Sequence, residues 1–398
     1  MKRKKIVFYT DCPFVAGCEN TLLNLLKFDK LSDTYDVVLI YRYSKRYRED
    51  LQKHELLNVK IHSIKLINFD NIIINLNYSK KKDLIIRIVI SIIQLLTLSK
   101  FVNLIKLYKI MKNQKPDIIH INNGGFPGAD SCNLLSLISK KVSSKTIYTI
   151  NNIPRINNLN LISKIYFYFI SKNIDYFTTG SKFVSYQISK VFKNQVKNIP
   201  NCININFKNN NKTDSEIIKR VKGNSKIFIS AGLLTKRKGF IELIEIFSSL
   251  NKEDFYLFIY GDGELRKEIQ NKINAVGLSE KVFLMGYTNN LLKEIKNSDY
   301  FVLNSLFNED MPYVLIEALS EQKPIISTDL AGINEIVIDG KNGYLSNPYD
   351  DQHFVENLNK AITLDETEYQ NLRKSCKNHF DENFDYIKNM NKYLNIYS

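Results

Sequence analysis

The stretch that follows the apolar run YFVL holds two carboxylates at a spacing that could serve one site. It reads NSLFNEDMPYVLIEAL, with Glu309 before Pro312 and Glu317 after it. Proline is tolerated in the first turn of a helix, so we expect a helix to begin at Pro312 with Asp310 or Met311 as its cap. Glu309 then lies on the loop, and Glu317 lies about a turn and a half inside the helix.

This placement would let Glu309 and Glu317 face one crevice. Carboxylates accept paired hydrogen bonds from vicinal hydroxyl groups, and the free N–H groups at a helix start attract phosphate. A sugar nucleotide offers hydroxyl pairs at both ends and a diphosphate between them. The alternative is that both carboxylates are solvated at the edge of a helix.

A group of cations follows the run KIFISA, in the segment GLLTKRKGF. Gly232 should open a turn, and Arg237 and Lys238 should lie beside the N-terminus of the next helix. Cations at that end oppose the helix dipole and need an anionic partner, for which a diphosphate would serve. The alternative is two cations that extend into solvent. The later turn YGDGELR is not a G-x-G-x-x-G, so a nicotinamide site has little support.

Short β-branched runs alternate with amphipathic segments along the chain, which is typical of parallel sheets built from βαβ units. In the first half, strands are expected at Ile6–Tyr9, Val37–Tyr41, Val59–Ile64, Ile118–Ile121, Thr146–Thr149 and Tyr176–Thr179. In the second half, they are expected at Ile227–Ala231, Tyr256–Tyr260, Val282–Met285, Tyr300–Leu303 and Ile325–Ser327. Helices are expected between the strands, including a long one from about Leu84 to Met111, and two or three more from Asp350 to Ser398.

The length of 398 residues and the apolar content of 44% predict two packed domains. The polar, Asn- and Lys-rich residues 201–223 should link a first domain, 1–200, to a second domain, 224–380. The remaining residues, 381–398, should form a C-terminal helix that packs back on the first domain. Ligands of open α/β sheets bind at the C-terminal ends of the strands, where both charged groups lie.

The formal net charge of +15 belongs to the first half of the chain. Residues 1–200 hold 32 Lys and Arg against 13 Asp and Glu, whereas residues 201–398 hold 24 against 28. A nucleic acid, a membrane surface or a phosphorylated substrate could be the anionic partner. No nucleic-acid recognition motif or aromatic stacking platform accompanies the charge, so we expect no nucleic acid.

The five cysteines are odd in number and contain no C-x-x-C, so they support neither a disulfide framework nor a zinc site. They suit a reducing compartment. The N-terminus MKRKKIVFYT is too strand-like for a signal peptide, and the most apolar window, Leu84–Leu98, is shorter than the roughly 20 residues of a spanning helix. A cytoplasmic location is expected.

The motifs together resemble the pattern of glycosyltransferase family 4 over nearly the whole chain. In order they are GLLTKRKG, GDGELR, GLSEKVFLMGY, NSDYFVLNS, EDMPYVLIEAL, KPIIST and NGYL. The resemblance implies an α/β fold of the GT-B type, with two Rossmann-like domains facing across a cleft and C-terminal helices. It also implies an acceptor-binding first domain and a second domain that binds a nucleotide-sugar donor.

The resemblance further implies roles for individual residues. Glu317 would hold the ribose and Glu309 the hydroxyls of the donor sugar, while Lys238 would bind the diphosphate. The loop around Gly286 would approach the base, and Gly17 in AGCENTLLNLL would let the backbone approach the donor phosphate. The complete donor site expected is Gly17, Gly232, Arg237, Lys238, Gly286, Glu309, Asp310, Met311, Pro312 and Glu317.

Two departures from the family pattern affect the donor site. Leu233 stands where the family usually has the arginine that binds the diphosphate, and Arg237 is its possible substitute. Asp310 stands where glycine is common. Its carboxylate either caps the helix or weakens donor binding by adding negative charge close to the phosphates.

Further departures affect the expected catalytic group, which consists of Glu309, Lys238, Asn122 and His120. In DIIHINNGGFPGAD, His120 matches the first histidine of the family's loop, but Asn122 replaces the second, which contacts the sugar. Asn151 likewise stands where histidine is frequent. The alternative for His120 is a buried core residue.

The expected mechanism uses no metal and no cofactor. The chain has no D-x-D motif, so the acidic ligands of a metal-bridged diphosphate are absent from the sequence. Protein cations and helix N-termini would neutralise the leaving group instead. The resemblance implies retention of anomeric configuration, and we expect a front-face displacement in which the donor phosphate accepts the acceptor's proton.

The segment Lys80–Lys115 has an apolar centre flanked by lysines. Such a segment could lie in a membrane interface with its lysines toward anionic head groups, or form a helix buried against its own sheet. We expect peripheral association with the inner face of the cell membrane.

The predicted function is that of a retaining hexosyltransferase. It would use a nucleotide sugar, a UDP-sugar in preference to a GDP-sugar, to extend a lipid-linked saccharide or a surface polysaccharide such as capsule or O-antigen. The alternatives are a sugar-nucleotide epimerase of the same fold and a non-catalytic relative that binds glycans or sugar nucleotides.

Overall fold

The computed structural model describes residues 3–15, 17–67, 99–156, 161–205, 225–251 and 255–398, together with residue 89. It divides the chain into two compact units. The first unit comprises Met1–Thr179, Ser185–Lys197 and Tyr393–Ser398, and the second comprises Gly180–Val184 and Asn198–Lys392. Relative to the boundary expected at residue 200, the short segment Gly180–Val184 lies with the second unit.

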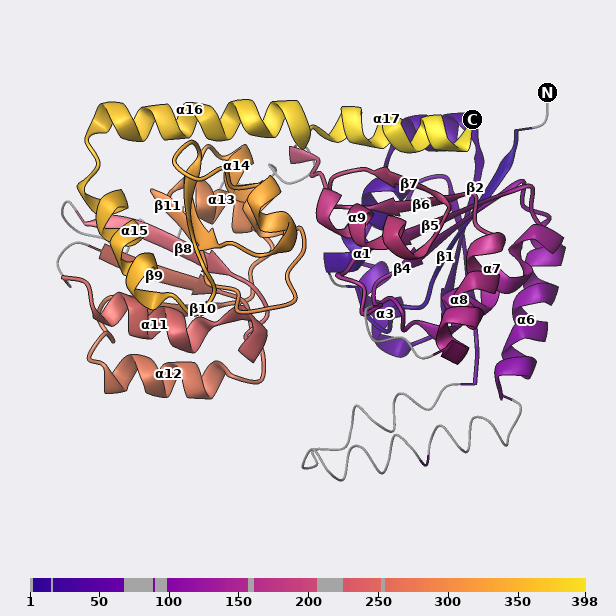
Figure 1. Cartoon of the computed structure of the whole chain (residues 1–398), viewed down its shortest axis with the longest axis horizontal. Coiled ribbons are helices and arrows are strands. Elements are labelled where there is room, and N and C mark those ends of the chain that lie inside the picture. Colours follow the sequence, from indigo (N-terminus) through magenta and orange to yellow (C-terminus); the bar gives the residue numbers. More distant parts are fainter. Residues whose placement is uncertain are drawn as a thin grey trace. The chain divides into compact units, whose positions relative to one another are not determined.

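The first unit is built on a seven-stranded sheet with the strand order β3-β2-β1-β4-β5-β6-β7 (Figure 1). The registered pairs from β3 to β6 are all parallel. The central strands β1, β4 and β5 are buried along nearly their whole length because helices cover both faces, as in other parallel sheets. The strands are β1 Lys5–Thr10, β2 Asp36–Arg42, β3 Val59–Ile64, β4 Ile118–Asn123, β5 Lys145–Ile150, β6 Tyr176–Thr179 and β7 Gln195–Asn198.

The helices of this unit connect successive strands. They are α1 Gly17–Leu26, α2 Asp29–Thr34, α3 Lys45–Leu51, α6 Ser99–Gln114, α7 Asp130–Ile138, α8 Leu161–Lys172 and α9 Lys182–Val191. Helix α6 is the C-terminal part of the long helix expected from Leu84. The expected membrane segment before it, including Lys80–Lys82, lies outside the described residues. Among the described helices, none combines the length and apolarity needed to cross a membrane.

The second unit is built on a six-stranded sheet with the order β10-β9-β8-β11-β12-β13. Its strands are β8 Lys226–Ala231, β9 Phe255–Tyr260, β10 Val282–Gly286, β11 Tyr300–Leu303, β12 Ile325–Thr328 and β13 Gly343–Ser346. Its helices are α11 Phe240–Ser248, α12 Arg266–Ala275, α13 Leu291–Lys296, α14 Tyr313–Ser320, α15 Asp351–Thr363, α16 Glu366–Asn383 and α17 Tyr386–Tyr397, the last of which ends in the first unit.

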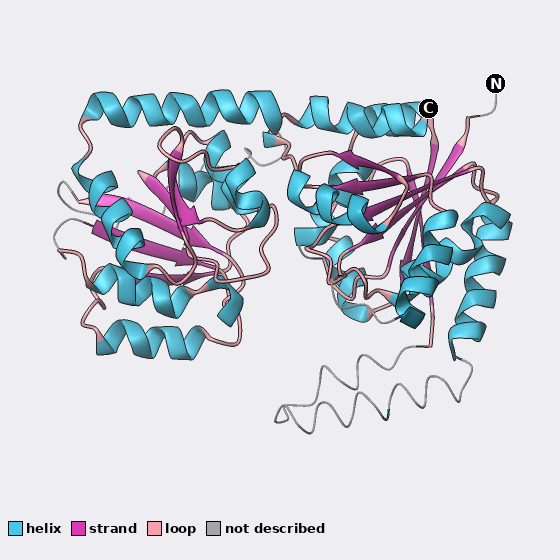
Figure 2. Ribbon diagram, in the orientation of Figure 1, coloured by secondary structure: helices cyan, strands magenta, loops and turns pink. Residues whose placement is uncertain are grey.

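Helices lie on both faces of this sheet (Figure 2), and each face has an apolar core. Successive residues of a strand point to opposite faces, so Phe228 packs with Phe247 of α11 while Ile229 belongs to the core that contains Leu315 of α14. Burial on both faces explains why these strands are continuous apolar runs.

All eleven strands expected from the sequence are present. The two strands that were not expected are β7 and β13, which lie at the edges of the two sheets. Their sequences, QVKN and GYLS, are short and are not continuous apolar runs, so they lack the signal that identified the other strands. Three helices follow Asp350, as expected.

The last residues of α17 pack inside the first unit. The phenol of Tyr397 is buried and lies 2.5 Å from Nδ1 of His120, whose Nε2 lies 2.6 Å from Oγ1 of Thr149. Lys145 also donates to the backbone carbonyl of Ile396. The C-terminus is thus an integral part of the first unit's core.

Replacing Tyr397 with phenylalanine should destabilise the first unit by about 1–3 kcal/mol, because a buried ring nitrogen of His120 would lose its partner. Urea unfolding followed by circular dichroism measures the change. The matched control is Tyr43→Phe, which removes a hydroxyl from an exposed ring. Equal stability of the two variants would contradict the structural role of the pair.

Candidate functional site

The loops after β8, β9, β10 and β11 are joined to one another by backbone hydrogen bonds. Gly232 donates to the carbonyl of Tyr260 at 3.0 Å, and Gly261 donates to that of Gly286 at 2.8 Å. Leu306, after β11, donates to the carbonyl of Arg237 at 2.9 Å. These contacts bring the predicted donor-site segments of the second unit together at the C-terminal edge of its sheet.

Two glycines permit this close approach. Gly239 has φ +62°, and a Cβ there would lie 2.1 Å from the carbonyl oxygen of Asn304. Gly261 has φ +126°, and a Cβ there would lie 1.9 Å from the carbonyl oxygen of Gly232. Side chains at either position would push the loops apart.

An ion cluster is the main chemical feature of this edge. Oε2 of Glu309 lies 2.5 Å from Nη1 of Arg237, 3.1 Å from Oγ of Ser305, and in direct contact with Nζ of Lys238. Lys238 and Glu309 are buried, and the stem of Lys238 passes beside Gly232. The two proposed diphosphate cations and the proposed sugar-binding carboxylate therefore form one cluster.

Charge pairing in this cluster opposes the cost of burial. Burial raises the pKa of Glu309, but the charges of Lys238 and Arg237 outweigh that effect, and the pKa is lowered overall. Burial lowers the pKa of Lys238, and Glu309 opposes the shift. With both groups ionised, the cluster holds two positive charges and one negative charge, so it suits an additional anion.

Asp310 does not cap helix α14, which corrects the expectation from the sequence. The N-cap residue is Pro312, with no side-chain cap, and Met311 is buried with its carbonyl accepting a bond from Asn201. The carboxyl of Asp310 instead contacts Oγ of Ser181. The partner is 129 residues away along the chain, so local spacing gave no sign of it.

The pKa of Asp310 is raised to about 7. Burial is the main cause, and the nearby carboxylates of Glu335 and Glu309 add to it, while the bond from Ser181 opposes it. Glu335 itself accepts from the backbone N–H groups of Lys182 and Phe183, at 3.0 Å each, at the start of α9.

Two other expected donor-site residues, Glu317 and Gly286, lie on this unit, as does Leu233, which stands where the family usually has an arginine. Glu317 is buried in α14, beyond the loop that carries Glu309, as expected. Leu233 is 58% exposed. Gly286 has φ +79°, and a Cβ there would meet only Nη1 of Arg266, at 3.9 Å.

Arg266 is a candidate that the sequence did not single out. Its Nη2 donates to the carbonyl of Leu284 at 3.2 Å, whereas its Nη1 is buried without a hydrogen-bond partner in the described part of the chain. Arg266 lines a cavity of about 510 Å³ together with Asp262 and Gln270. Its place in GDGELR, directly after a glycine turn at a strand end, was the available signal.

A separate polar cluster lies in the first unit. The carboxylate of Glu19 in α1 is buried and accepts from Thr10 at 2.9 Å, Tyr47 at 2.5 Å and Asn122 at 2.8 Å. Asn122 also accepts from Asn151 at 2.8 Å. Burial raises the pKa of Glu19, and these hydrogen bonds oppose the rise. Glu19 was not predicted as a site residue, although it is the only charged residue of α1.

Gly17, at the start of α1, lies next to this cluster in the sequence, and a Cβ there would meet nothing within 4 Å. Sγ of Cys18 lies 3.6 Å from Sγ of Cys12. Gly124 packs against both sulfur atoms, since a Cβ on it would lie 2.7 Å from Cys18 and 2.9 Å from Cys12. The sulfur pair and Gly124 thus line the loops after β1 and β4.

His120 lies in the core of the first unit. Both ring nitrogens have partners, Tyr397 and Thr149, and burial lowers its pKa to about 3. A neutral, enclosed imidazole corresponds to the alternative in which His120 is a buried core residue. Asn122 is also buried, and it belongs to the polar cluster around Glu19.

Comparisons with known proteins identify the family. Residues 211–379 match the family model described as glycosyl transferases group 1. The uncharacterized glycosyltransferase MJ1059 of Methanocaldococcus jannaschii is 31% identical over 294 residues, which cover 66% of this chain and 71% of that protein. The chain belongs to the group 1 glycosyltransferases.

A second relative of this glycosyltransferase is the Escherichia coli UDP-Gal:alpha-D-GlcNAc-diphosphoundecaprenol alpha-1,3-galactosyltransferase. It is 25% identical over 312 residues, covering 74% of this chain and 78% of the relative. Among solved structures, Anabaena HepE in complex with UDP matches with a TM-score of 0.75 and 16% identity, covering 98% of each chain. The two parallel sheets are therefore those of a GT-B fold.

The raised pKa of Asp310 predicts a pH-dependent stability. Because folding favours the protonated carboxyl, its contribution is fully present below about pH 4 and is lost as the pH rises through about 7. Asp310→Asn should therefore flatten the decline in the free energy of unfolding over that window, which is at most about 1.4 kcal/mol per pH unit.

Denaturant unfolding at a series of pH values measures this effect. Glu264→Gln, at an exposed carboxylate of the same unit, is the control and should leave the pH profile unchanged. A wild-type profile that Asp310→Asn does not alter would show that the carboxyl ionises normally in the folded protein.

Proposed function

We propose that this glycosyltransferase moves a hexose from a nucleotide sugar, a UDP-sugar in preference to a GDP-sugar, to a lipid-linked saccharide or a growing surface polysaccharide. The cluster of Arg237, Lys238 and Glu309 carries the proposal. Two names support it: the HepE structure contains UDP, and the E. coli relative is named for a UDP-Gal donor and a diphosphoundecaprenol-linked acceptor.

The donor diphosphate would be a second counter-ion of Arg237 and Lys238, in addition to Glu309. Only one carboxylate now offsets these two cations, so a diphosphate adds charge compensation without displacing a full complement of ion pairs. The three contacts to Glu309 all use Oε2, and within the described residues Oε1 has no hydrogen-bond partner. Oε1 would therefore accept from the hydroxyls of the donor sugar.

The transfer step needs charge stabilisation rather than a protein nucleophile. The acceptor oxygen would bond to the anomeric carbon on the face from which the diphosphate departs, so configuration is retained. The acceptor's proton would pass to a phosphate oxygen, and the nucleoside diphosphate would leave. Lys238 and Arg237 would stabilise the negative charge that develops on the leaving group, without a metal ion or a cofactor.

Arg266 would contribute to binding the nucleotide. A buried N–H group without a partner costs about 1–3 kcal/mol, and such a group in a native protein calls for an acceptor. Nη1 of Arg266 lies beside Gly286, where a missing side chain leaves room for a ligand. An oxygen of the nucleotide would satisfy this donor.

The first unit would bind the acceptor. Asn122 lies at the C-terminal edge of its sheet, where ligands of open α/β sheets bind, and the buried carboxylate of Glu19 fixes its side chain by accepting a hydrogen bond from it. The excess of basic residues in this half would hold the enzyme at the inner face of the cell membrane, where a lipid-linked acceptor is available.

Glu309→Gln and Lys238→Met should each lower kcat by about 100-fold or more, because each removes a charged group at the proposed site of bond cleavage. Release of nucleoside diphosphate from a panel of nucleotide sugars, with mass spectrometry of products made on a lipid-linked acceptor, measures the effect. Activity in a chelator tests the metal-independent mechanism in the same assay.

Glu245→Gln and Lys272→Met are the matched controls, since they alter an ion pair on the exposed side of the same unit. They should leave kcat within about twofold of the wild type, as surface pairs contribute little. Thermal unfolding of every variant separates lost activity from lost folding. A folded Glu309→Gln protein with normal activity would refute the assignment.

Arg266→Gln should raise the KM for the nucleotide sugar about tenfold, the equivalent of one lost hydrogen bond to a charged donor, with a smaller change in kcat. Steady-state kinetics with a varied donor measures it. Arg373→Gln is the control, because Nε of Arg373 is likewise buried with no hydrogen-bond partner among the described residues, but Arg373 lies on α16. An equal KM change in both variants would mean that the effect is structural.

A further inference from the structure

Helix α8 in the first unit exposes an apolar stripe. Its other face is buried through Phe167 and Ile170. The exposed residues recur at the i, i+4, i+7 and i+8 spacing of a single helix face. They are Leu161 (73% exposed), Ile165 (50%), Tyr168 (54%) and Phe169 (54%). A helix that is apolar on two sides in this way has one face left for another partner.

Lysines border the same stripe. Lys164 and Lys172 lie on this face of α8, and Lys190 and Lys193 lie at and after the end of α9. All four line one cavity of about 730 Å³, together with Tyr168 and Asn194. Nζ of Lys172 lies 4.6 Å from the ring of Tyr168, and Nζ of Lys190 lies 4.1 Å from the 59%-exposed ring of Tyr186.

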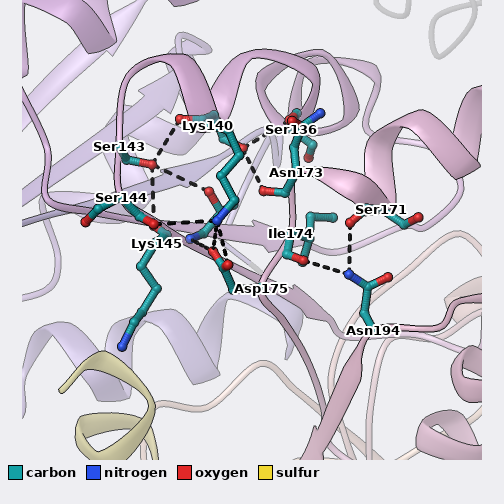
Figure 3. A network of polar contacts seen from close by, with 12 residues as sticks. Ser136, Lys140, Ser143, Ser144, Lys145, Ser171, Asn173, Ile174, Asp175 and Asn194 are labelled. Atoms are coloured by element: carbon teal, nitrogen blue, oxygen red, sulfur yellow. Dashed lines mark hydrogen bonds and ion pairs between the residues drawn. The ribbon is translucent and has the colours of Figure 1, made fainter.

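This surface has a single acidic neighbour in the sequence. Between Asp130 and Asp214 the chain holds twelve Lys and Arg residues and a single acidic residue, Asp175. The carboxylate of Asp175 is paired with Lys140, whose Nζ lies 2.5 Å from Oδ1 and 2.6 Å from Oδ2 (Figure 3). Within the described residues, none of the four cavity lysines forms an ion pair.

The two sides of the cavity are fixed to each other. Nδ2 of Asn194 donates to the carbonyls of Ser171, at 2.9 Å, and Ile174, at 2.6 Å, as Figure 3 shows. These bonds hold the C-terminal end of α8 against the segment that follows α9. The lysines at the ends of α8 and α9 therefore belong to segments that are hydrogen-bonded to each other.

We infer that α8 and the end of α9 form a docking surface for an anionic phospholipid bilayer. The apolar stripe would enter the acyl boundary, the tyrosines would lie at head-group level, and the lysines would contact lipid phosphates. This inference rests on the proposed function, because a lipid-linked acceptor must be reached at a membrane. It identifies a membrane-binding surface outside the apolar segment that the sequence suggested for this role.

Sedimentation of the full chain with vesicles tests the inference. One set contains phosphatidylglycerol and phosphatidylcholine in equal parts, and the other contains phosphatidylcholine alone. The wild type should bind the first set much more tightly. Reversing four lysines, with Lys164→Glu, Lys172→Glu, Lys190→Glu and Lys193→Glu combined, should weaken that binding several hundred-fold, since each lysine near an anionic surface contributes about fivefold.

The matched control reverses four exposed lysines of the second unit, with Lys296→Glu, Lys341→Glu, Lys360→Glu and Lys374→Glu combined. It has the same net charge as the first variant and should bind much more like the wild type. A third variant, Ile165→Ser with Phe169→Ser, keeps the charge and should weaken binding at least about tenfold by removing apolar contact.

Equal loss in the two lysine variants would overturn the inference, because it would show that only net charge matters. Unchanged binding of the serine variant would overturn the apolar contact. A different result would overturn the inference as a whole: light scattering shows that the wild type is a dimer and the serine variant a monomer, and neither protein binds vesicles. Donor cleavage with a water-soluble acceptor is measured in parallel, so vesicle binding without transfer would reject the proposed function and leave the docking surface intact.

Discussion

The buried contact between Lys238 and Glu309 is the interaction on which the site of the second unit depends. A charge removed from water is costly unless an opposite charge and hydrogen bonds compensate it, and here each residue is the other's main compensation. The contact joins the loop after β8 to the loop after β11. It requires that Gly239 adopt a left-handed conformation against the carbonyl of Asn304, which no other residue type could do without moving the strand end.

The pKa values of two adjacent carboxyl groups in this site are shifted in opposite directions. Glu309 has two cations as neighbours, so it ionises more readily than usual. Asp310 is buried and has two carboxylates nearby, so it ionises less readily. The sequence alone suggested that Asp310 adds negative charge near the donor phosphates. Because the pKa of Asp310 is raised to about 7, its carboxyl stays partly protonated at neutral pH and contacts Ser181. The cluster of Arg237, Lys238 and Glu309 therefore retains its excess of positive charge.

The elements that sequence reasoning located are those whose signal is local. Strands buried on both faces must be apolar at every position, so runs such as Phe255–Tyr260 could be recognised. Short edge strands such as Gln195–Asn198 lack that signal. The loop order around Lys238 and Glu309 also followed from sequence motifs. The bond from Ser181 to Asp310 and the network around Glu19 could not be foreseen, because they join residues that only the fold brings together.

The two units use positive charge in different ways. In the second unit, Lys238 is buried and paired, so its interaction is short in range, little screened by salt and able to discriminate among ligands by geometry. In the first unit, the lysines around α8 are not paired with acidic residues in the described chain, and they border exposed apolar side chains. Such charges attract from a distance but are screened within about 10 Å at ordinary ionic strength, so they favour a large anionic surface over a single small ligand. In the proposed function, the excess charge of the first half would determine where the enzyme works, and the few buried charges of the second half would determine which donor it binds.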